Sequence, residues 1–161
     1  MDKIRIMFVC HGNICRSPMA EFIFKDLLFK SQLNNSFVVK SSATSTEEIW
    51  NGIGNPVFPQ AKHKLSENGI SCEGKRVVQL KSDDYEKYDY FVGMDGANIR
   101  NMNIIFRGDA DEKIHKLMDF TARHGDVADP WYSGDFDTAY NDIREGCVAL
   151  LEFLINKHNG D

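Results

Sequence analysis

The stretch Val9-Cys10-His11-Gly12-Asn13-Ile14-Cys15-Arg16-Ser17-Pro18 decides the fold of this chain. The apolar run that precedes it predicts a buried strand over Ile4–Cys10, and the residues that follow predict a helix over Pro18–Lys30. Ser17 is a favourable N-cap for that helix, and Pro18 is a favourable first helical residue. The stretch is therefore predicted to form a loop between a strand and the N-terminus of a helix.

This loop has the properties of an anion site built around a thiol. A helix N-terminus presents unpaired N–H groups and about half a positive charge, which favour a bound anion. Cys10 is expected to lie among these amides and next to the guanidinium of Arg16. Such surroundings lower the pKa of a thiol from about 8.5 to about 3.5–7.5. The loop therefore predicts a cysteine that is a thiolate at neutral pH.

Composition is that of a soluble globular protein. The 161 residues predict a single domain, 1–161, and the hydrophobic and charged fractions, 42% and 27%, are ordinary for this class. No apolar run approaches the roughly 20 residues that span a bilayer, and no signal-peptide core precedes the first strand, so we expect a cytoplasmic protein without a membrane partner. A net charge of −5 without a Lys/Arg cluster disfavours nucleic acid as a partner.

The cysteines and histidines favour neither a metal site nor a disulfide framework. The spacings of the four cysteines fit no zinc or secreted pattern: Cys10, Cys15, Cys72 and Cys147. The five histidines are scattered and form no His-Glu-x-x-His pattern. We therefore expect reduced thiols, no metal ion and no cofactor.

Strand signals alternate with helix signals along the chain, which predicts a three-layer α/β domain with a parallel sheet. Three further strands are predicted over Phe37–Ser41, Tyr88–Met94 and Ile114–Phe120. Further helices are predicted from Pro56 (capped by Asn55) to the residue before Gly69, over Ser82–Lys87, after Asp95, and from Asp137 to about Lys157. Loops are expected over Ala43–Asn55 and around Asp129-Pro130.

Two motifs carry a family resemblance. Cys10-(five residues)-Arg16-Ser17-Pro18, with Gly12-Asn13 inside it, resembles the phosphate-binding loop of the low-molecular-weight protein tyrosine phosphatases. Asp129-Pro130-Trp131-Tyr132 resembles the general-acid loop of the same family. The resemblance covers nearly the whole chain and implies a four-stranded parallel sheet, order 2-1-3-4, with helices on both faces. It places the first motif at the carboxyl end of the first strand, where open α/β sheets bind ligands.

The resemblance implies that a monomeric enzyme hydrolyses phosphotyrosine proteins or small aryl phosphates. The thiolate of Cys10 attacks phosphorus to form a cysteinyl-phosphate, and Asp129 protonates the leaving phenolate. Water then attacks the phosphoenzyme with Asp129 as the base. Arg16 grips two phosphoryl oxygens, and the N–H groups of residues 11–16 stabilise the remaining charge. Phosphate and vanadate are expected as competitive inhibitors.

Several neighbours of Cys10 have supporting roles by resemblance. The phosphate-binding loop comprises His11, Gly12, Asn13, Ile14, Cys15 and Ser17 around the catalytic pair Cys10 and Arg16. Asn13 tolerates the left-handed conformation and holds the loop shape. The hydroxyl of Ser17 hydrogen-bonds the thiolate. Cys15 is either an inert small residue or, as we favour, a redox partner that traps oxidised Cys10 as a disulfide. Asp95 is expected to be structural, or simply a helix cap.

Three aromatic residues near the loop are expected to form a slot for the substrate, and two other residues depart from the family pattern. Trp131 and Tyr132 are expected to form one wall of a slot for an aromatic ring, and Trp50 the opposite wall. His11 stands where the family usually has an apolar residue, so a second charge beside the nucleophile is expected to alter pH dependence or substrate choice. Lys75 falls near the position of a family histidine that braces the loop asparagine, which puts that brace in doubt.

Two relatives of the same scaffold fit the sequence less well. Arsenate reductases need two further cysteines about seventy residues beyond the nucleophile, and residues 78–95 contain none. Protein-arginine phosphatases carry threonine at the position of Ile14. An isoleucine there favours an aromatic phosphate over a polar guanidinium, so phosphotyrosine is the preferred substrate.

Two other classes of protein, a nucleotide-binding protein and a phosphotyrosine-binding module, fit the sequence less well. Gly69–Arg76 nearly matches a nucleotide-binding P-loop, but Arg76 replaces the hydroxyl that binds the metal ion, and the preceding residues predict a helix end and no strand. A non-catalytic phosphotyrosine-binding module would not need a complete set of Cys10, Arg16 and Asp129. An enzyme is therefore the favoured interpretation.

Overall fold

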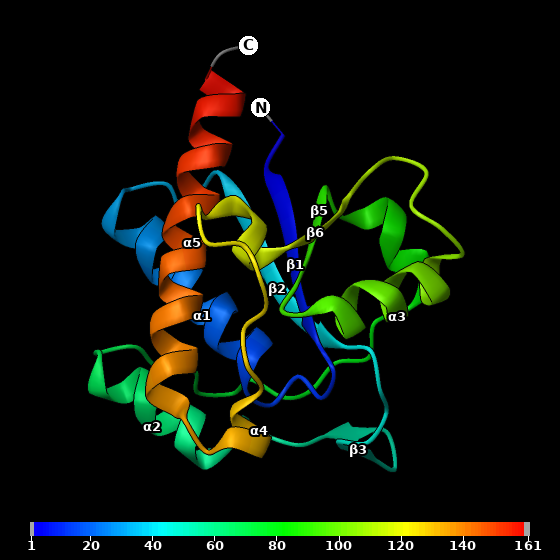
Figure 1. The fold of residues 1–161 in the computed structure, drawn as a ribbon, viewed down its shortest axis with the longest axis vertical. Coiled ribbons are helices and arrows are strands. Elements are labelled where there is room, and N and C mark those ends of the chain that lie inside the picture. Colours follow the sequence, from blue (N-terminus) through cyan, green and yellow to red (C-terminus); the bar gives the residue numbers. More distant parts are fainter. Residues whose placement is uncertain (1, 160–161) are drawn as a thin grey trace.

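A parallel four-stranded sheet forms the centre of the computed structural model, which describes residues 2–159 (Figure 1). Its strands are β1 (Ile4–Cys10), β2 (Phe37–Ala43), β5 (Tyr90–Gly93) and β6 (Ile114–Lys116). Their spatial order is β2-β1-β5-β6, which is the predicted order 2-1-3-4 when only these four strands are counted. All three pairings in the sheet are parallel. The predicted α/β architecture is therefore confirmed.

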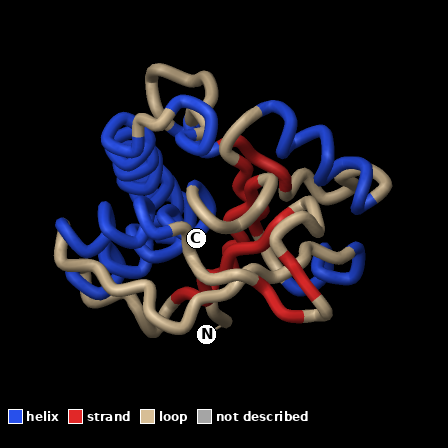
Figure 2. Tube along the Cα trace, turned by 90° about the horizontal axis from the view of Figure 1, so that it is seen from below, coloured by secondary structure: helices blue, strands red, loops and turns tan. Residues whose placement is uncertain are grey.

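Helices cover both faces of the sheet (Figure 2). On one face lie α1 (Arg16–Lys30), α2 (Pro59–Glu67) and α5 (Phe136–Asn159), and on the other lie α3 (Gly96–Phe106) and the 3-10 helix η1 (Ser82–Lys87). Among these helices, as the structure describes them, none is long and apolar enough to cross a bilayer.

The central strand β1 supplies both hydrophobic cores by the alternation of its side chains. Ile6 and Phe8 are buried in the larger core, under α1 and α5. Met7 and Val9 are buried in the smaller core with Phe91. Successive strand residues point to opposite faces, so one strand of apolar residues can bury both. Cys10 follows in the register of Phe8 and reaches the larger core at the strand's carboxyl end.

Strand β5 starts two residues later than predicted, and strand β6 ends four residues earlier than predicted. β5 starts at Tyr90; at Asp89, just before it, the side-chain carboxylate accepts from the Arg5 N–H of β1 at 2.8 Å, and the Asp89 N–H donates to the Arg5 carbonyl at 2.8 Å. β6 ends at Lys116, and the next residues form the 3-10 helix η2 (Leu117–Phe120). Leu117 is fully buried and packs against Gly146 of α5, where a Cβ atom would lie 2.5 Å from it. Burial of this side chain outweighs continued strand pairing.

The predicted starts of two helices are wrong. α1 begins at Arg16 with Cys15 as its N-cap, so Ser17 is inside the first turn and is not the cap. α2 begins at Pro59, three residues after Pro56, and Pro59 takes the first helical position. Asn55 was expected to cap this helix. It is instead paired with an extended segment, because its carbonyl accepts from the Val77 N–H at 3.0 Å.

The predicted loop Ala43–Asn55 contains a hairpin formed by β3 (Ile49–Trp50) and β4 (Ile53–Gly54). Its turn residues Asn51 and Gly52 both have positive φ, 51° and 76°, which is the pattern of a type I′ turn. The Asn-Gly pair was the signal in the sequence that could have identified this hairpin. The loop around Asp129 also contains a short helix, α4 (Pro130–Ser133).

Candidate active site

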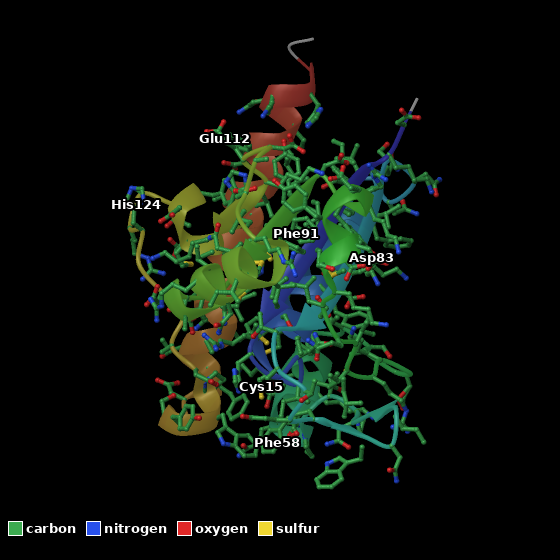
Figure 3. The ribbon with its side chains drawn as sticks, turned by 90° about the vertical axis from the view of Figure 1, so that its right-hand side faces the viewer. Cys15, Phe58, Asp83, Phe91, Glu112 and His124 are labelled. Carbon is green, nitrogen blue, oxygen red and sulfur yellow. The ribbon has the colours of Figure 1, made fainter. Side chains whose placement is uncertain are left out.

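The two motifs meet in one pocket at the carboxyl end of β1. The pocket has a volume of about 120 Å³. Its lining comes from the loop after β1, the segment before β3 and the start of α4: Cys10, His11, Gly12, Asn13, Ile14, Cys15, Arg16, Glu47, Glu48, Asp129, Trp131 and Tyr132. Figure 3 shows Cys15 and Phe58 at this end of the molecule, where the Phe58 N–H donates to the Ile14 carbonyl at 2.9 Å.

The thiol of Cys10 is buried and hydrogen-bonded from within its own loop. Its Sγ lies 3.0 Å from the hydroxyl of Ser17 and accepts from the Asn13 N–H at 3.2 Å. Asn13 has a φ of 57°, so the left-handed conformation expected for this residue is present. The turn at Asn13 is what directs its N–H back to the sulfur. Ser17 is placed beside the thiol because it lies inside the first turn of α1 and does not cap it.

Arg16 is buried beneath the pocket and makes three fixed contacts. Its guanidinium donates to Asp95 Oδ2 at 2.7 Å, to the Val127 carbonyl at 2.9 Å and to Asp129 Oδ2 at 3.4 Å. Burial disfavours its charge, but the negative charges of Cys10, Asp95 and Asp129 outweigh this and raise the pKa of Arg16. The side chain therefore stays cationic and aligned.

Asp95 fulfils both structural alternatives that the sequence left open. It caps α3 by accepting from the Asn98 N–H at 2.9 Å, and its other oxygen anchors Arg16. Burial raises the pKa of Asp95, but the hydrogen bonds from Arg16 and Asn98 are stronger in sum, and the pKa lies below the ordinary aspartate value. Asp95 is thus an anion that holds the guanidinium from behind.

The side chain of Asn13 is fully bonded in the interior. Its Oδ1 accepts from the Val78 N–H at 3.1 Å. Its Nδ2 donates to Ser17 Oγ at 2.7 Å and to Ser41 Oγ at 3.0 Å. The asparagine therefore connects the loop after β1 with β2 and with the segment before η1.

Lys75 reaches this group of residues from behind without contacting Asn13. Its Nζ donates to the Ser41 carbonyl at 2.9 Å and lies 3.6 Å from Glu21 Oε1. Glu21 in turn accepts from the Ser41 hydroxyl at 2.6 Å. Sequence reasoning did not identify Glu21 or Ser41. The available signal was a glutamate on the apolar side of α1, next to buried Ala20.

Asp129 lies at the edge of the pocket as the N-cap of α4. Its Oδ1 accepts from the Trp131 N–H at 3.1 Å, and its Oδ2 faces the guanidinium of Arg16. The carboxylate is partly exposed, with 27% of its side-chain surface accessible. A group in this position can exchange a proton with solvent and with a molecule in the pocket.

The rim of the pocket has one aromatic side and one acidic side. Trp131 and Tyr132 line it as expected, and the Trp131 ring packs edge-on against Phe58 at 5.0 Å. The expectation for Trp50 is not met, because this side chain lies in the β3–β4 hairpin, is 71% exposed and does not line the pocket. Glu48 lines it instead, and its Cγ lies against Gly12, 3.6 Å from where a Cβ would be. The β3–β4 hairpin therefore places the tryptophan outside the pocket.

Two further loop residues have distinct surroundings. His11 Nε2 lies 3.0 Å from Glu47 Oε2 at the rim, so the departure from an apolar residue creates a surface ion pair when the imidazole is protonated. Burial, together with the negative charges of Cys10 and Asp129, raises the pKa of Cys15 to about 12. Cys15 is thus a neutral thiol at neutral pH. All four cysteines are free.

A thiol, a guanidinium and a carboxylate gathered at the carboxyl end of the first strand of an α/β sheet define a cysteine-dependent phosphatase. Residues 5–159 match the model of the family described as "Low molecular weight phosphotyrosine protein phosphatase", and the chain belongs to this family. It is accordingly a protein-tyrosine phosphatase, a hydrolase of phosphotyrosine monoesters that acts through a cysteinyl-phosphate intermediate.

The relatives are similar over almost their whole length. Low molecular weight protein-tyrosine-phosphatase YfkJ of Bacillus subtilis is 36% identical over 150 residues, 92% of this chain and 94% of that protein. The low molecular weight phosphotyrosine protein phosphatase of Gallus gallus is 34% identical, over 91% and 93% of the two chains. The crystal structure of YfkJ has a TM-score of 0.91 at 34% identity and covers 98% of each chain. Vibrio vulnificus Wzb in complex with benzylphosphonate has a TM-score of 0.79 at 27% identity, over 93% and 98%.

Proposed function

We propose that Cys10 is the nucleophile of this phosphatase, Arg16 its phosphate ligand and Asp129 its general acid. The observation that carries the proposal is the pocket itself, in which Arg16 Nη2 lies 3.4 Å from Asp129 Oδ2 although the two residues are 113 positions apart. A phosphoryl group held by the guanidinium would have the thiol on one side and the carboxyl group on the other. This is the order of groups that an in-line displacement requires.

In the first step, the thiolate of Cys10 attacks phosphorus, the S–P bond forms and the P–O bond to the aryl group breaks. Asp129 gives its proton to the departing oxygen, so a phenol leaves in place of a phenolate. The guanidinium of Arg16 pairs with two of the three equatorial oxygens, and the backbone N–H groups of residues 11–16 stabilise the remaining negative charge. The product is a cysteinyl-phosphate with Asp129 ionised.

In the second step, Asp129 takes a proton from water, and the oxygen of that water attacks phosphorus. The S–P bond breaks, inorganic phosphate forms and Cys10 leaves as the thiolate. The hydroxyl of Ser17, 3.0 Å from the sulfur, is placed to stabilise the leaving thiolate by donating a hydrogen bond. Division of one displacement into two gives each step an activated nucleophile.

The walls of the pocket support an aryl phosphate as substrate. Trp131 and Tyr132 offer aromatic surface at the entrance, and Ile14 contributes an apolar side chain to the lining. Aromatic and apolar surfaces of this kind suit the phenyl ring of an aryl phosphate. Phosphotyrosine proteins and small aryl phosphates are therefore the proposed substrates, with phosphate and vanadate as competitive inhibitors. We further propose that the protein is a monomer and that it works in the cytoplasm, in line with its four free thiols.

The test compares hydrolysis of matched peptides that carry phosphotyrosine, phosphoserine or phosphoarginine, with arsenate reduction as a further assay. We expect phosphotyrosine to have the highest kcat/KM, and vanadate to inhibit competitively. Higher turnover of the phosphoarginine peptide, or arsenate reduction without a phosphatase activity, would contradict the proposal.

A further inference from the structure

A line of hydrogen bonds leads from the thiol of Cys10 into the interior of the molecule and ends on a carboxylate. Cys10 Sγ contacts Ser17 Oγ at 3.0 Å, and Asn13 Nδ2 donates to Ser17 Oγ at 2.7 Å. The same Nδ2 donates to Ser41 Oγ at 3.0 Å, and Ser41 Oγ donates to Glu21 Oε1 at 2.6 Å. All five residues are buried, and Glu21 is only 3% exposed.

The chemistry of these groups fixes the direction of every bond in the line. An ionised carboxylate can only accept, so the proton of Ser41 points at Glu21 and a lone pair of Ser41 faces Asn13. The amide nitrogen of Asn13 can only donate, so Ser17 accepts from it. The proton of Ser17 is then free, and the sulfur of Cys10 is the acceptor in reach. Ser17 therefore donates to Cys10 and favours its thiolate form.

The orientation of the Asn13 amide has an independent support. The backbone N–H of Val78 donates to Asn13 Oδ1 at 3.1 Å, so the amide nitrogen must face the two hydroxyl groups. A hydroxyl of Ser41 whose proton also pointed at that nitrogen would meet it donor to donor. Ser41 therefore needs an acceptor elsewhere, and Glu21 supplies it.

Two ammonium groups form ion pairs with the carboxylate of Glu21. Lys75 Nζ lies 3.6 Å from Oε1, and its side chain is 10% exposed. Lys25, one turn further along α1, contacts Oε2. Both contacts are those of a carboxylate paired with cations, and a carboxylate only accepts, as the direction of the line requires.

We propose that Glu21 is a positioning residue for the nucleophile: its buried carboxylate and the backbone N–H of Val78 together fix the direction of the hydrogen bonds behind the loop, so that Ser17 donates its proton to the thiolate of Cys10. This inference rests on the proposed role of Cys10 as the nucleophile. Glu21 touches neither the pocket nor a molecule bound in it, so it acts on the ionisation of the thiol and takes no part in the displacement itself.

The direction in which the ionisation midpoint of Cys10 moves on removal of Glu21 distinguishes a positioning role from a simple effect of charge. A carboxylate that acted only through its negative charge would repel the thiolate, and its removal would let Cys10 ionise at lower pH. Loss of the Glu21 carboxylate leaves the Ser41 hydroxyl without its acceptor. This disturbs the hydrogen bond that Asn13 donates to Ser17, and so weakens the bond from Ser17 to the sulfur of Cys10. Its removal would therefore make Cys10 ionise at higher pH.

The experiment measures the rate at which iodoacetamide alkylates Cys10 as a function of pH, with the modified peptide identified by mass spectrometry. For Glu21→Met we expect the midpoint of the profile to move up by about one pH unit, and kcat for an aryl phosphate at low pH to fall several-fold. Glu21→Gln keeps a side-chain oxygen for Ser41, and its midpoint is expected to stay within a few tenths of a unit. Glu152→Met, at an exposed position of α5, serves as the matched control and should titrate like the wild type.

An unmoved or lowered midpoint in Glu21→Met would overturn the proposal, as would a Glu21→Gln profile displaced as far as that of Glu21→Met. Ser41→Ala breaks the same line one bond nearer to the thiol and should raise the midpoint similarly. It carries the test if Glu21→Met does not fold, and an unchanged midpoint there is equally decisive against the proposal.

A double-mutant cycle tests whether Glu21 acts through Ser41. In the Ser41→Ala background, Glu21→Met should produce no further displacement of the midpoint, whereas additive displacements would contradict the line of bonds. The proposed function is judged separately. If the wild type hydrolyses phosphotyrosine and the midpoint for Cys10 alkylation in Glu21→Met equals that of the wild type, only the role of Glu21 is refuted. If the wild type does not hydrolyse phosphotyrosine, the proposed function is refuted.

Discussion

The floor of the pocket and its rim are built by opposite means. On the floor, Cys10, Asn13, Arg16 and Ser17 are no more than 4% exposed, and hydrogen bonds to three distant segments hold them. On the rim, Trp131 and Tyr132 are 53% and 84% exposed. A buried polar group costs stability unless it is bonded, so the floor has one arrangement. The exposed rim carries no such constraint, and its residues can change without loss of the fold.

The comparison predicts that substitutions on the floor abolish chemistry, with the largest effect at Cys10. Cys10→Ser replaces the thiolate by a hydroxyl that is not ionised at neutral pH, so kcat should fall below detection while phosphate still binds. Steady-state hydrolysis of an aryl phosphate and titration with phosphate measure the two properties. Turnover retained in this variant would mean that another group is the nucleophile.

Asp129 lies between the floor and the rim, and its loss should have the next largest effect. Asp129→Ala removes the proton donor, and kcat should fall by about 10²–10⁴-fold with little change in KM. Aryl phosphates with poorer leaving groups should lose the most, because they depend most on protonation. A kcat equal to that of the wild type, for any leaving group, would assign the general acid elsewhere.

Asp95 tests how strongly the floor is held from behind. Its pKa is lower in the folded than in the unfolded protein, so its ionised form stabilises the fold above the unfolded value of about 3.9, and this contribution is lost as the pH falls toward the folded value. Asp95→Asn should lower the free energy of unfolding by about 1.5–3 kcal/mol near pH 7. Denaturant unfolding from pH 7 to pH 3 measures this, and a difference that does not shrink with acid would contradict the assignment.

Two tryptophans at the rim provide a matched pair. Trp131 lines the pocket and Trp50 does not. Trp131→Ala should raise KM for a phosphotyrosine peptide by about two- to tenfold with kcat nearly unchanged, since an aromatic pair contributes about 0.5–1.5 kcal/mol. Trp50→Ala should leave both constants as they are. A larger effect at Trp50 would mean that the hairpin folds over bound substrate.

Cys15 should affect recovery from oxidation and not turnover. Its raised pKa keeps it a neutral thiol, so Cys15→Ser should retain normal kcat. After treatment with peroxide, the wild type should regain activity with a reductant, whereas Cys15→Ser should recover less because oxidised Cys10 is not trapped as a disulfide. Equal recovery in both proteins would show that Cys15 is an inert lining residue.

The sequence predicted local features of the floor well, because adjacent residues encode them. The bounds of β1, the capping of α3 by Asp95 and the left-handed Asn13 all follow from short patterns. The assignment of Ser17 as a helix cap was wrong, whereas its contact with the sulfur of Cys10, which the resemblance implied, is present at 3.0 Å.

What the sequence did not predict depends on contacts between distant segments. Glu21 and Ser41 come together because α1 packs on β2, and no spacing pattern encodes that pair. Trp50 was misplaced because it lies in the β3–β4 hairpin, outside the pocket, and Glu48 lines this side of the rim instead. The rim is therefore the part of the site where a structure adds most to the sequence.

Rapid quenching of the enzyme during hydrolysis of a phosphotyrosine peptide, followed by mass spectrometry of its peptides, tests the central claim most directly. We predict a phosphoryl group on the peptide that contains Cys10, formed within the first turnover and absent from Cys10→Ser. Phosphoryl transfer to any other residue, or continued turnover with no adduct at all, would contradict the account.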